Sequence, residues 1–176
     1  MKKIYLIRSA KAEDFSQGIS DFERSLRGKG LKEINTIGSY LALQDISPDL
    51  ILSSCALRAQ ETAIELSQKI GFEGRKYFFE ELYSSSYEDI LNIIMAQEDE
   101  DNSIFVVAHN PHLIELSNWF SDENIAKLPT MGVVSLSLEI DKWIELESKK
   151  AKVEFFIYPN QFKYYMPKQI KNTLPR

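Results

Sequence analysis

The chain has 176 residues, of which 44% are apolar and 27% are charged, and this balance suits one globular domain rather than a disordered chain. Its net charge of −5 argues against a general nucleic-acid-binding protein, which would normally present a basic face. Cys55 is the only cysteine, so an internal disulfide is excluded and a reducing, cytoplasmic compartment is expected. The first apolar run, residues 4–7, is too short for a signal peptide or a membrane span, so no membrane association is expected.

Apolar runs that suit buried strands alternate with segments of helical periodicity, a pattern typical of a parallel sheet covered by helices. Buried strands are expected at residues 4–7 and 103–108, with the sequences "IYLI" and "SIFVVA". Two further strands are expected at residues 48–54 and 75–79, with the sequences "PDLILSS" and "RKYFF", of which the second is short. A first helix is expected at about residues 23–44, because apolar residues recur there at helical spacing: Leu31, Ile34, Ile37 and Leu41.

Short capping signals mark the boundaries of the later helices. A second helix is expected to end at Gly71, which suits a C-terminal cap, and its apolar face comprises Ala59, Ala63, Leu66 and Ile70. Ser86 and Asp89 resemble a capping box at the start of another helix. Asn110 suits the N-cap, and Pro111 the first position, of a helix that follows the fourth strand.

Two segments near the end of the chain suit the strands of a sheet edge. In "VVSLSLEI" apolar and polar residues alternate, which places four residues on one face: Val134, Leu136, Leu138 and Ile140. The segment "KVEFFIY" is expected to pair with it. The expected fold is therefore an α/β three-layer sandwich with a mostly parallel central sheet.

The C-terminal residues differ in charge from the rest of the chain. Residues 1–158 are expected to form one domain, and residues 159–176 a tail with four basic side chains and no acidic one. The tail either packs on the domain through Phe162, Tyr164 and Tyr165, or forms a basic surface that steers an acidic protein partner.

Polar side chains that suit anion binding follow three of the expected strands: Arg8 and Ser9, then Ser53, Ser54 and Arg58, then His109 and Asn110. The carboxyl ends of parallel strands meet at one edge of a sheet, where ligands bind, and two helix N-termini would add positive dipole ends there. A guanidinium group can donate two parallel hydrogen bonds to two oxygens of one phosphate, and an imidazole adds a donor that can become charged near neutral pH. The sequence therefore predicts a phosphate-binding pocket.

Six short motifs, in order over residues 1–140, resemble those of the histidine phosphatase superfamily: "LIRSAKAE", "DFERSLRGKG", "SSCALRAQETA", "EELY", "VVAHNP" and "LPTMG". The first motif of that family usually reads Leu-Ile-Arg-His-Gly or Arg-His-Ala, and Ser9 stands where the catalytic histidine belongs. The short chain, the "AHNP" form and the absence of a long insertion resemble SixA-type phosphohistidine phosphatases more than phosphoglycerate mutases.

The resemblance implies a reaction through a covalent phosphohistidine on residue 9, with no cofactor and no metal. It assigns phosphate binding to Arg8, Arg58 and His109, and it implies a phosphohistidine protein of a phosphorelay as the partner. A serine hydroxyl is a poor nucleophile unless a base removes its proton, so the pocket is expected to be inactive or to trap its substrate. Ser9 is then a natural loss of activity, a substitution introduced to trap a ligand, or an unusual nucleophile.

The acid that protonates a leaving group is less defined. Glu80 and Glu81 hold the position of a catalytic carboxylate in "FFEELY", with Glu81 as the preferred candidate, but both also suit solvated charges before a helix. Lys11 either lines the rim of the pocket or points to water.

Plainer interpretations remain open for the other site residues. Arg8 could form a salt bridge at a sheet edge, and Arg58 could pair along its helix with Glu61 or Glu65. The only histidines, His109 and His112, lack further ligands nearby for a metal site. Two alternative functions also remain: a non-catalytic module that binds phosphohistidine or phosphate, and a small-molecule phosphomonoesterase of the same fold.

Overall fold

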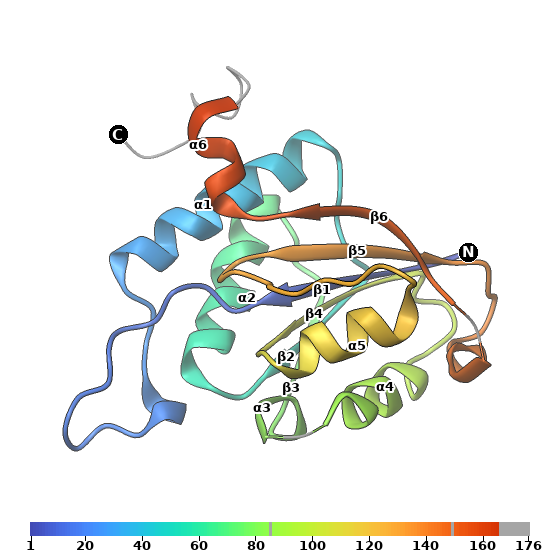
Figure 1. Cartoon of the computed structure of the whole chain (residues 1–176), viewed down its shortest axis with the longest axis horizontal. Coiled ribbons are helices and arrows are strands. Elements are labelled where there is room, and N and C mark those ends of the chain that lie inside the picture. The colour runs from blue at the N-terminus through green and yellow to red at the C-terminus, as the bar shows by residue number, and fades with distance from the viewer. Residues whose placement is uncertain (85, 149, 166–176) are drawn as a thin grey trace.

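A computed structural model describes residues 1–84, 86–148 and 150–165, and it is built around a six-stranded sheet of order β3-β2-β4-β1-β5-β6 (Figure 1). The neighbouring pairs β3-β2, β2-β4 and β4-β1 are parallel, whereas β5 runs antiparallel to both β1 and β6. The strands are β1 (Lys2–Arg8), β2 (Leu50–Ser54), β3 (Arg75–Phe79), β4 (Ser103–Ala108), β5 (Val133–Leu138) and β6 (Lys152–Ile157). The mostly parallel sheet predicted from the sequence is confirmed.

Helices cover both faces of this sheet, which gives the three expected layers (Figure 1). The α-helices are α1 (Gly28–Leu43), α2 (Leu57–Ile70), α3 (Glu81–Ser84), α4 (Tyr87–Met95), α5 (His112–Phe120) and α6 (Phe162–Tyr165). Three short 3-10 helices are η1 (Asp21–Glu23), η2 (Trp143–Ser148) and η3 (Pro159–Gln161). Within the described residues, no helix has the length and apolar character needed to cross a membrane.

Each face of the sheet has its own apolar core. On one face Ile4 and Leu6 of β1 pack with residues of α4, α5 and η2; on the other Tyr5 and Ile7 pack with residues of α1 and α2. Side chains alternate between faces along a strand, so Arg8 continues the first set and the next residue, Ser9, continues the second. Two adjacent residues thereby leave the end of β1 toward opposite sides of the sheet.

The first helix begins later than the sequence predicted, at Gly28 instead of about residue 23. The preceding residues are extended because they pair with the segment after β1: Ala12 and Leu26 form an antiparallel bridge, and the Arg27 N–H donates to the Lys11 carbonyl. Gly30 allows this close approach, since a Cβ there would lie 2.3 Å from the Lys11 oxygen. The expected core residue Leu31 lies at the open edge of a groove between α1 and α2 and is 47% exposed.

The capping signals were predicted with mixed success. Gly71 adopts the left-handed conformation that ends α2, with φ of 71°, and Ser86 and Asp89 form the expected capping box of α4. The prediction for α5 was wrong, because the helix begins at His112 with Pro111 as its N-cap after a cis peptide bond. The Asn110 amide is engaged elsewhere, since its Nδ2 donates to the Leu128 carbonyl at 2.9 Å.

The last two strands pair as expected, but β5 is buried on both faces. It is an interior strand, and Ser135 and Ser137 on its polar face are covered as well, with the Ser137 hydroxyl donating to Glu154 at 2.7 Å. Beyond β6, Phe162 is buried and its ring lies 5.2 Å from that of Tyr40 on α1. The side chains of Tyr164 and Tyr165, and residues 166–176 of the basic tail, lie outside the described residues.

Candidate active site

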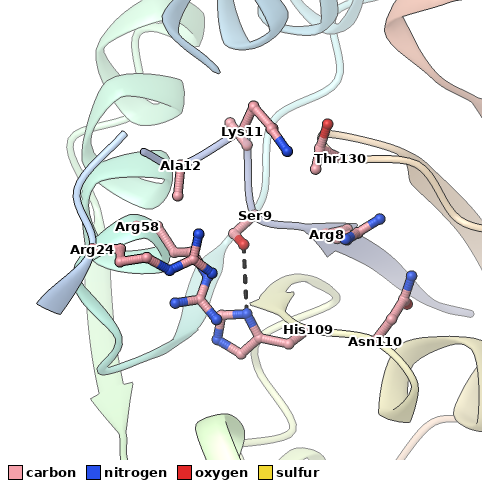
Figure 2. Close-up of a pocket in the computed structure, with 10 residues that line it drawn as sticks. Arg8, Ser9, Lys11, Ala12, Arg24, Arg58, His109, Asn110 and Thr130 are labelled. Atoms are coloured by element: carbon pink, nitrogen blue, oxygen red, sulfur yellow. Dashed lines mark hydrogen bonds between the residues drawn. The ribbon is translucent and has the colours of Figure 1, made fainter. Parts of the chain in front are cut away.

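A cavity of about 140 Å³ lies where β1 and β4 end, and it collects most of the residues that the sequence placed at the strand ends (Figure 2). Ser53 and Ser54 were placed there too, but they do not line the cavity. Arg8, Ser9, Arg58 and His109 all contribute to its wall. The complete lining is Arg8, Ser9, Ala10, Lys11, Ala12, Arg24, Arg58, His109, Asn110 and Thr130. Four of these ten side chains are lysine or arginine, so the cavity offers several cationic hydrogen-bond donors, the groups that bind phosphate oxygens in proteins.

Backbone hydrogen bonds fix the position of Ser9 at the floor of the cavity. Its N–H donates to the Ala108 carbonyl at 3.0 Å, and the next N–H, of Ala10, donates to the Thr62 hydroxyl of α2 at 3.0 Å. The Ser9 side chain is buried, and its Oγ lies 3.5 Å from Nδ1 of His109, the contact drawn as a dashed line in Figure 2. Residue 9 therefore occupies a rigid position that faces the imidazole.

Arg8 approaches the cavity from the side opposite Arg24 and Arg58 (Figure 2). One guanidinium nitrogen, Nη1, donates to the Leu128 carbonyl at 3.0 Å, and β1 lies inside the sheet. The plain interpretation of Arg8 as a salt bridge at a sheet edge is therefore wrong. Burial lowers the pKa of the Arg8 guanidinium, and the Glu33 carboxylate opposes this shift.

Arg58 and Arg24 are held together by a residue of η1. The Asp21 carboxylate accepts from Nη2 of Arg58 at 3.2 Å and from Nη2 of Arg24 at 2.6 Å, and the Asp21 carbonyl accepts from Nη1 of Arg58 at 2.8 Å. The pairing of Arg58 with Glu61 or Glu65 is not the arrangement found, because Glu61 instead accepts the Leu26 N–H at 2.8 Å. One carboxylate thus orients two cations.

Asp21 stays ionised over the whole physiological range. Partial burial works to raise its pKa, but hydrogen bonds from Tyr83 and Arg24 and the charges of Arg58 and Arg24 outweigh burial and lower the pKa to about 2. The Tyr83 hydroxyl donates to Asp21 Oδ2 at 2.7 Å, and the Tyr83 ring meets the His109 ring edge-on at 5.7 Å. Asp21 and Tyr83 therefore connect η1 to both the arginines and the histidine of the cavity.

The surroundings of His109 favour the neutral imidazole at neutral pH, contrary to the expectation of an imidazole that becomes charged there. Burial, and then the positive charge of Arg58, lower its pKa to about 3, whereas Asp21 opposes the shift. Its Nε2 lies 2.8 Å from the hydroxyl of Ser54, the last residue of β2.

The upper rim is tied to α1 through a buried carboxylate. Glu33 accepts the Lys11 N–H at 2.9 Å with one oxygen and the Thr130 hydroxyl at 2.7 Å with the other. It thereby joins the segment after β1 to the segment before β5. Lys11 lines the cavity, as one of its two sequence interpretations proposed.

The sequence analysis did not predict Arg24 and Thr130 as cavity residues, nor Asp21 as the residue that orients Arg24 and Arg58. Arg24 and Asp21 belong to the motif "DFERSLRGKG", from which the resemblance assigns no role to either residue. Their three-residue spacing places both side chains on one side of η1, and this was the signal that could have found them.

The candidate acids lie away from this wall. Glu81 begins α3, Glu80 precedes it, and both are exposed and absent from the cavity lining. Their charges act instead on Cys55, whose pKa is raised by burial first and then by these two carboxylates. The catalytic role of Glu81 stays a prediction.

His112 lies outside the lining, and no cluster of three or more potential metal ligands occurs in the part of the chain that the structure describes.

Comparisons with known proteins identify relatives and solved structures that are similar to this chain. No family model matches the chain. An uncharacterized protein of Mycobacterium leprae is 26% identical over 161 residues, which cover 86% of this chain and 97% of the relative. A SixA structure from Agrobacterium tumefaciens is 27% identical, with a TM-score of 0.78 over 90% of this chain and 98% of the other. The protein histidine phosphatase SixA, solved with tungstate, is 20% identical, with a TM-score of 0.79 and coverage of 91% and 99%.

The fold and the cavity define a class first: an α/β protein with a cavity rich in basic side chains at the carboxyl ends of its parallel strands. The likeness to the SixA structures then adds that the chain has the fold of the histidine phosphatase superfamily, to which these solved neighbours belong.

Proposed function

We propose that this protein handles the phosphoryl group of a phosphohistidine-bearing protein, as a phosphatase of the SixA type whose nucleophile position holds a serine. One observation carries the proposal: Arg8, Arg58 and His109 converge in a single cavity around residue 9. In a loose phosphoryl-transfer transition state, charge spreads over three equatorial oxygens, and these are the atoms that guanidinium groups and an imidazole N–H would hold.

Residue 9 is the part of the cavity least suited to catalysis. For Ser9 to attack phosphorus, a base must take the hydroxyl proton, and the nearest imidazole is His109, with Oγ to Nδ1 at 3.5 Å. A histidine with a pKa of about 3 is a poor base, and a bound phosphate that raised this pKa would leave the ring protonated and without a free lone pair. Ser9 is therefore expected to support binding without efficient turnover, so that the protein retains its substrate.

The chemistry of the wall favours a substrate with a good leaving group. Among the described residues that line the cavity, none is a carboxylate that could protonate an alkoxide. Imidazole leaves far more easily than an alkoxide, so phosphohistidine needs less acid assistance than an alkyl phosphate ester. This difference supports phosphohistidine over a small-molecule phosphomonoester. The serine keeps the non-catalytic binding module as the second candidate.

The substrate class is tested by binding, because turnover by the Ser9 protein is expected to be slow. A phosphohistidine-bearing phosphotransfer protein should bind at least about tenfold more tightly than its unphosphorylated form, since the guanidinium contacts are charge-assisted hydrogen bonds. Calorimetry or a pull-down with both forms measures the difference, and Arg58→Ala is the matched control that should abolish it.

Two outcomes would replace the proposal. Equal affinity for the phosphorylated and unphosphorylated partner would remove phosphohistidine as the substrate. Tight binding of the phosphorylated protein with no gain of turnover when residue 9 is made histidine would establish the non-catalytic module instead.

A further inference from the structure

Ser54 makes a contact with the site histidine that neither the strand-end pattern nor the motif comparison assigned. It is the last residue of β2 and is fully buried, and its Oγ lies 2.8 Å from Nε2 of His109. His109 is itself only 8% exposed and turns its other ring nitrogen, Nδ1, toward Ser9 and the cavity. Nε2 therefore faces Ser54 in the protein interior, whereas Nδ1 faces Ser9 in the cavity.

The hydrogen bonds of the Ser54 hydroxyl indicate which acceptor its proton faces. The same Oγ accepts the Ala56 N–H at 3.1 Å, and within the described residues its remaining hydrogen-bond partner is His109 Nε2. A hydroxyl that already accepts from the backbone completes its pattern by donating. Donation to Nε2 requires a lone pair on that nitrogen, and in a neutral imidazole the ring proton then resides on Nδ1.

We propose that Ser54 is a positioning residue that holds His109 in the Nδ1–H tautomer, so that the ring donates a hydrogen bond into the cavity. In the other tautomer an Nδ1 lone pair would face the anion and repel its oxygens. The burial and neighbouring cations that keep the ring neutral make the choice of tautomer decisive. The tautomer stands on the Ser54 contact alone, whereas its use in holding a phosphoryl oxygen rests on the proposed function.

The chain contains two histidines, so NMR can measure the tautomer of His109 with little overlap. Long-range ¹H–¹⁵N NMR at pH 7 should give two imidazole spin systems, and His112→Gln assigns them by removing one. For His109 we expect a protonated, pyrrole-type Nδ1 and a pyridine-type Nε2. In Ser54→Ala the Nε2 partner is lost, and the spectrum should shift to a mixed or reversed tautomer, whereas Ser54→Thr keeps the hydroxyl and should retain the wild-type pattern.

Phosphate titration of the wild-type protein, Ser54→Ala and Ser54→Thr gives the functional readout. Ser54→Ala should weaken phosphate binding by about tenfold, the effect of one misdirected hydrogen bond to an anion, and Ser54→Thr should restore it. A protonated Nε2 in the wild-type protein, or an unchanged tautomer in folded Ser54→Ala, would overturn the proposal. If the tautomer is as expected but phosphate does not bind the wild type, the proposed function fails while the role of Ser54 in setting the tautomer stands.

Discussion

Replacing Ser9 by histidine is expected to give the protein a phosphatase activity about 10³-fold or more above that of the serine form, the order of effect seen when a nucleophile is absent or present. The cavity already supplies charged donors from Arg8, Arg58 and Arg24. An imidazole attacks through an unprotonated nitrogen and needs no base, and the neighbouring arginines favour that neutral form. Hydrolysis of a phosphohistidine protein and of p-nitrophenyl phosphate by both forms measures the change.

The covalent step gives this experiment its control. The histidine form should carry acid-labile phosphate on residue 9, formed as the P–N bond to the new imidazole replaces the P–N bond of the substrate, and water should then release it. Ser9→His combined with Arg58→Ala should lose most of the gained rate. Turnover of phosphohistidine by the serine form at the rate of the histidine form would show that Ser9 is a nucleophile or takes no part in the chemistry.

Acidification is expected to destabilise the protein through His109. The pKa of His109 is about 3 in the folded protein, below the ordinary histidine value of 6.5 that applies in the unfolded chain. Between these two pH values the unfolded chain binds a proton that the folded protein does not. The free energy of unfolding should therefore fall as pH drops below 6.5, by about 2 kcal/mol between pH 6.5 and 5. Asp21, with its pKa of about 2, adds a loss only below its ordinary value of 3.8.

Urea denaturation at pH 7 and pH 5 tests this linkage. His109→Asn should remove most of the drop, because the variant lacks the group that takes up the proton on unfolding. His112→Gln is the matched control and should keep the drop. The charged groups that act on His109 are Arg58, Asp21, Arg8 and, if protonated, His112. An equal drop in wild type and His109→Asn would assign the acid sensitivity to other groups.

The strand-end residues could be predicted from sequence because the physics that places them is local. An apolar run forms a buried strand, its end lies at the ligand-binding edge, and Arg8, Ser9 and His109 follow such runs directly. Asp21 and Arg24 could not be placed in this way, because they lie in a segment without periodicity whose position depends on contacts with the distant residues Arg58 and Tyr83.

The same distinction explains the wrong helix boundaries. Asn110 is a good N-cap residue by intrinsic preference, but a tertiary hydrogen bond to the Leu128 carbonyl takes its amide. The start of α1 is moved by the bridge between Ala12 and Leu26, which holds the preceding residues extended. The lowered pKa of His109 likewise depends on burial and on Arg58, neither of which a single sequence displays.

Calorimetric titration of inorganic phosphate into the wild-type protein and Arg58→Ala tests most directly whether this cavity is a phosphoryl site. The wild type, with Ser9 in place, should bind phosphate at one site, and Arg58→Ala should weaken binding by about tenfold or more, because a charge-assisted hydrogen-bond donor is lost. Arg75→Ala, which changes an arginine on β3 outside the cavity, is the matched control and should bind like the wild type. Equal phosphate affinity in the wild type and Arg58→Ala, or no binding to either, would contradict the account.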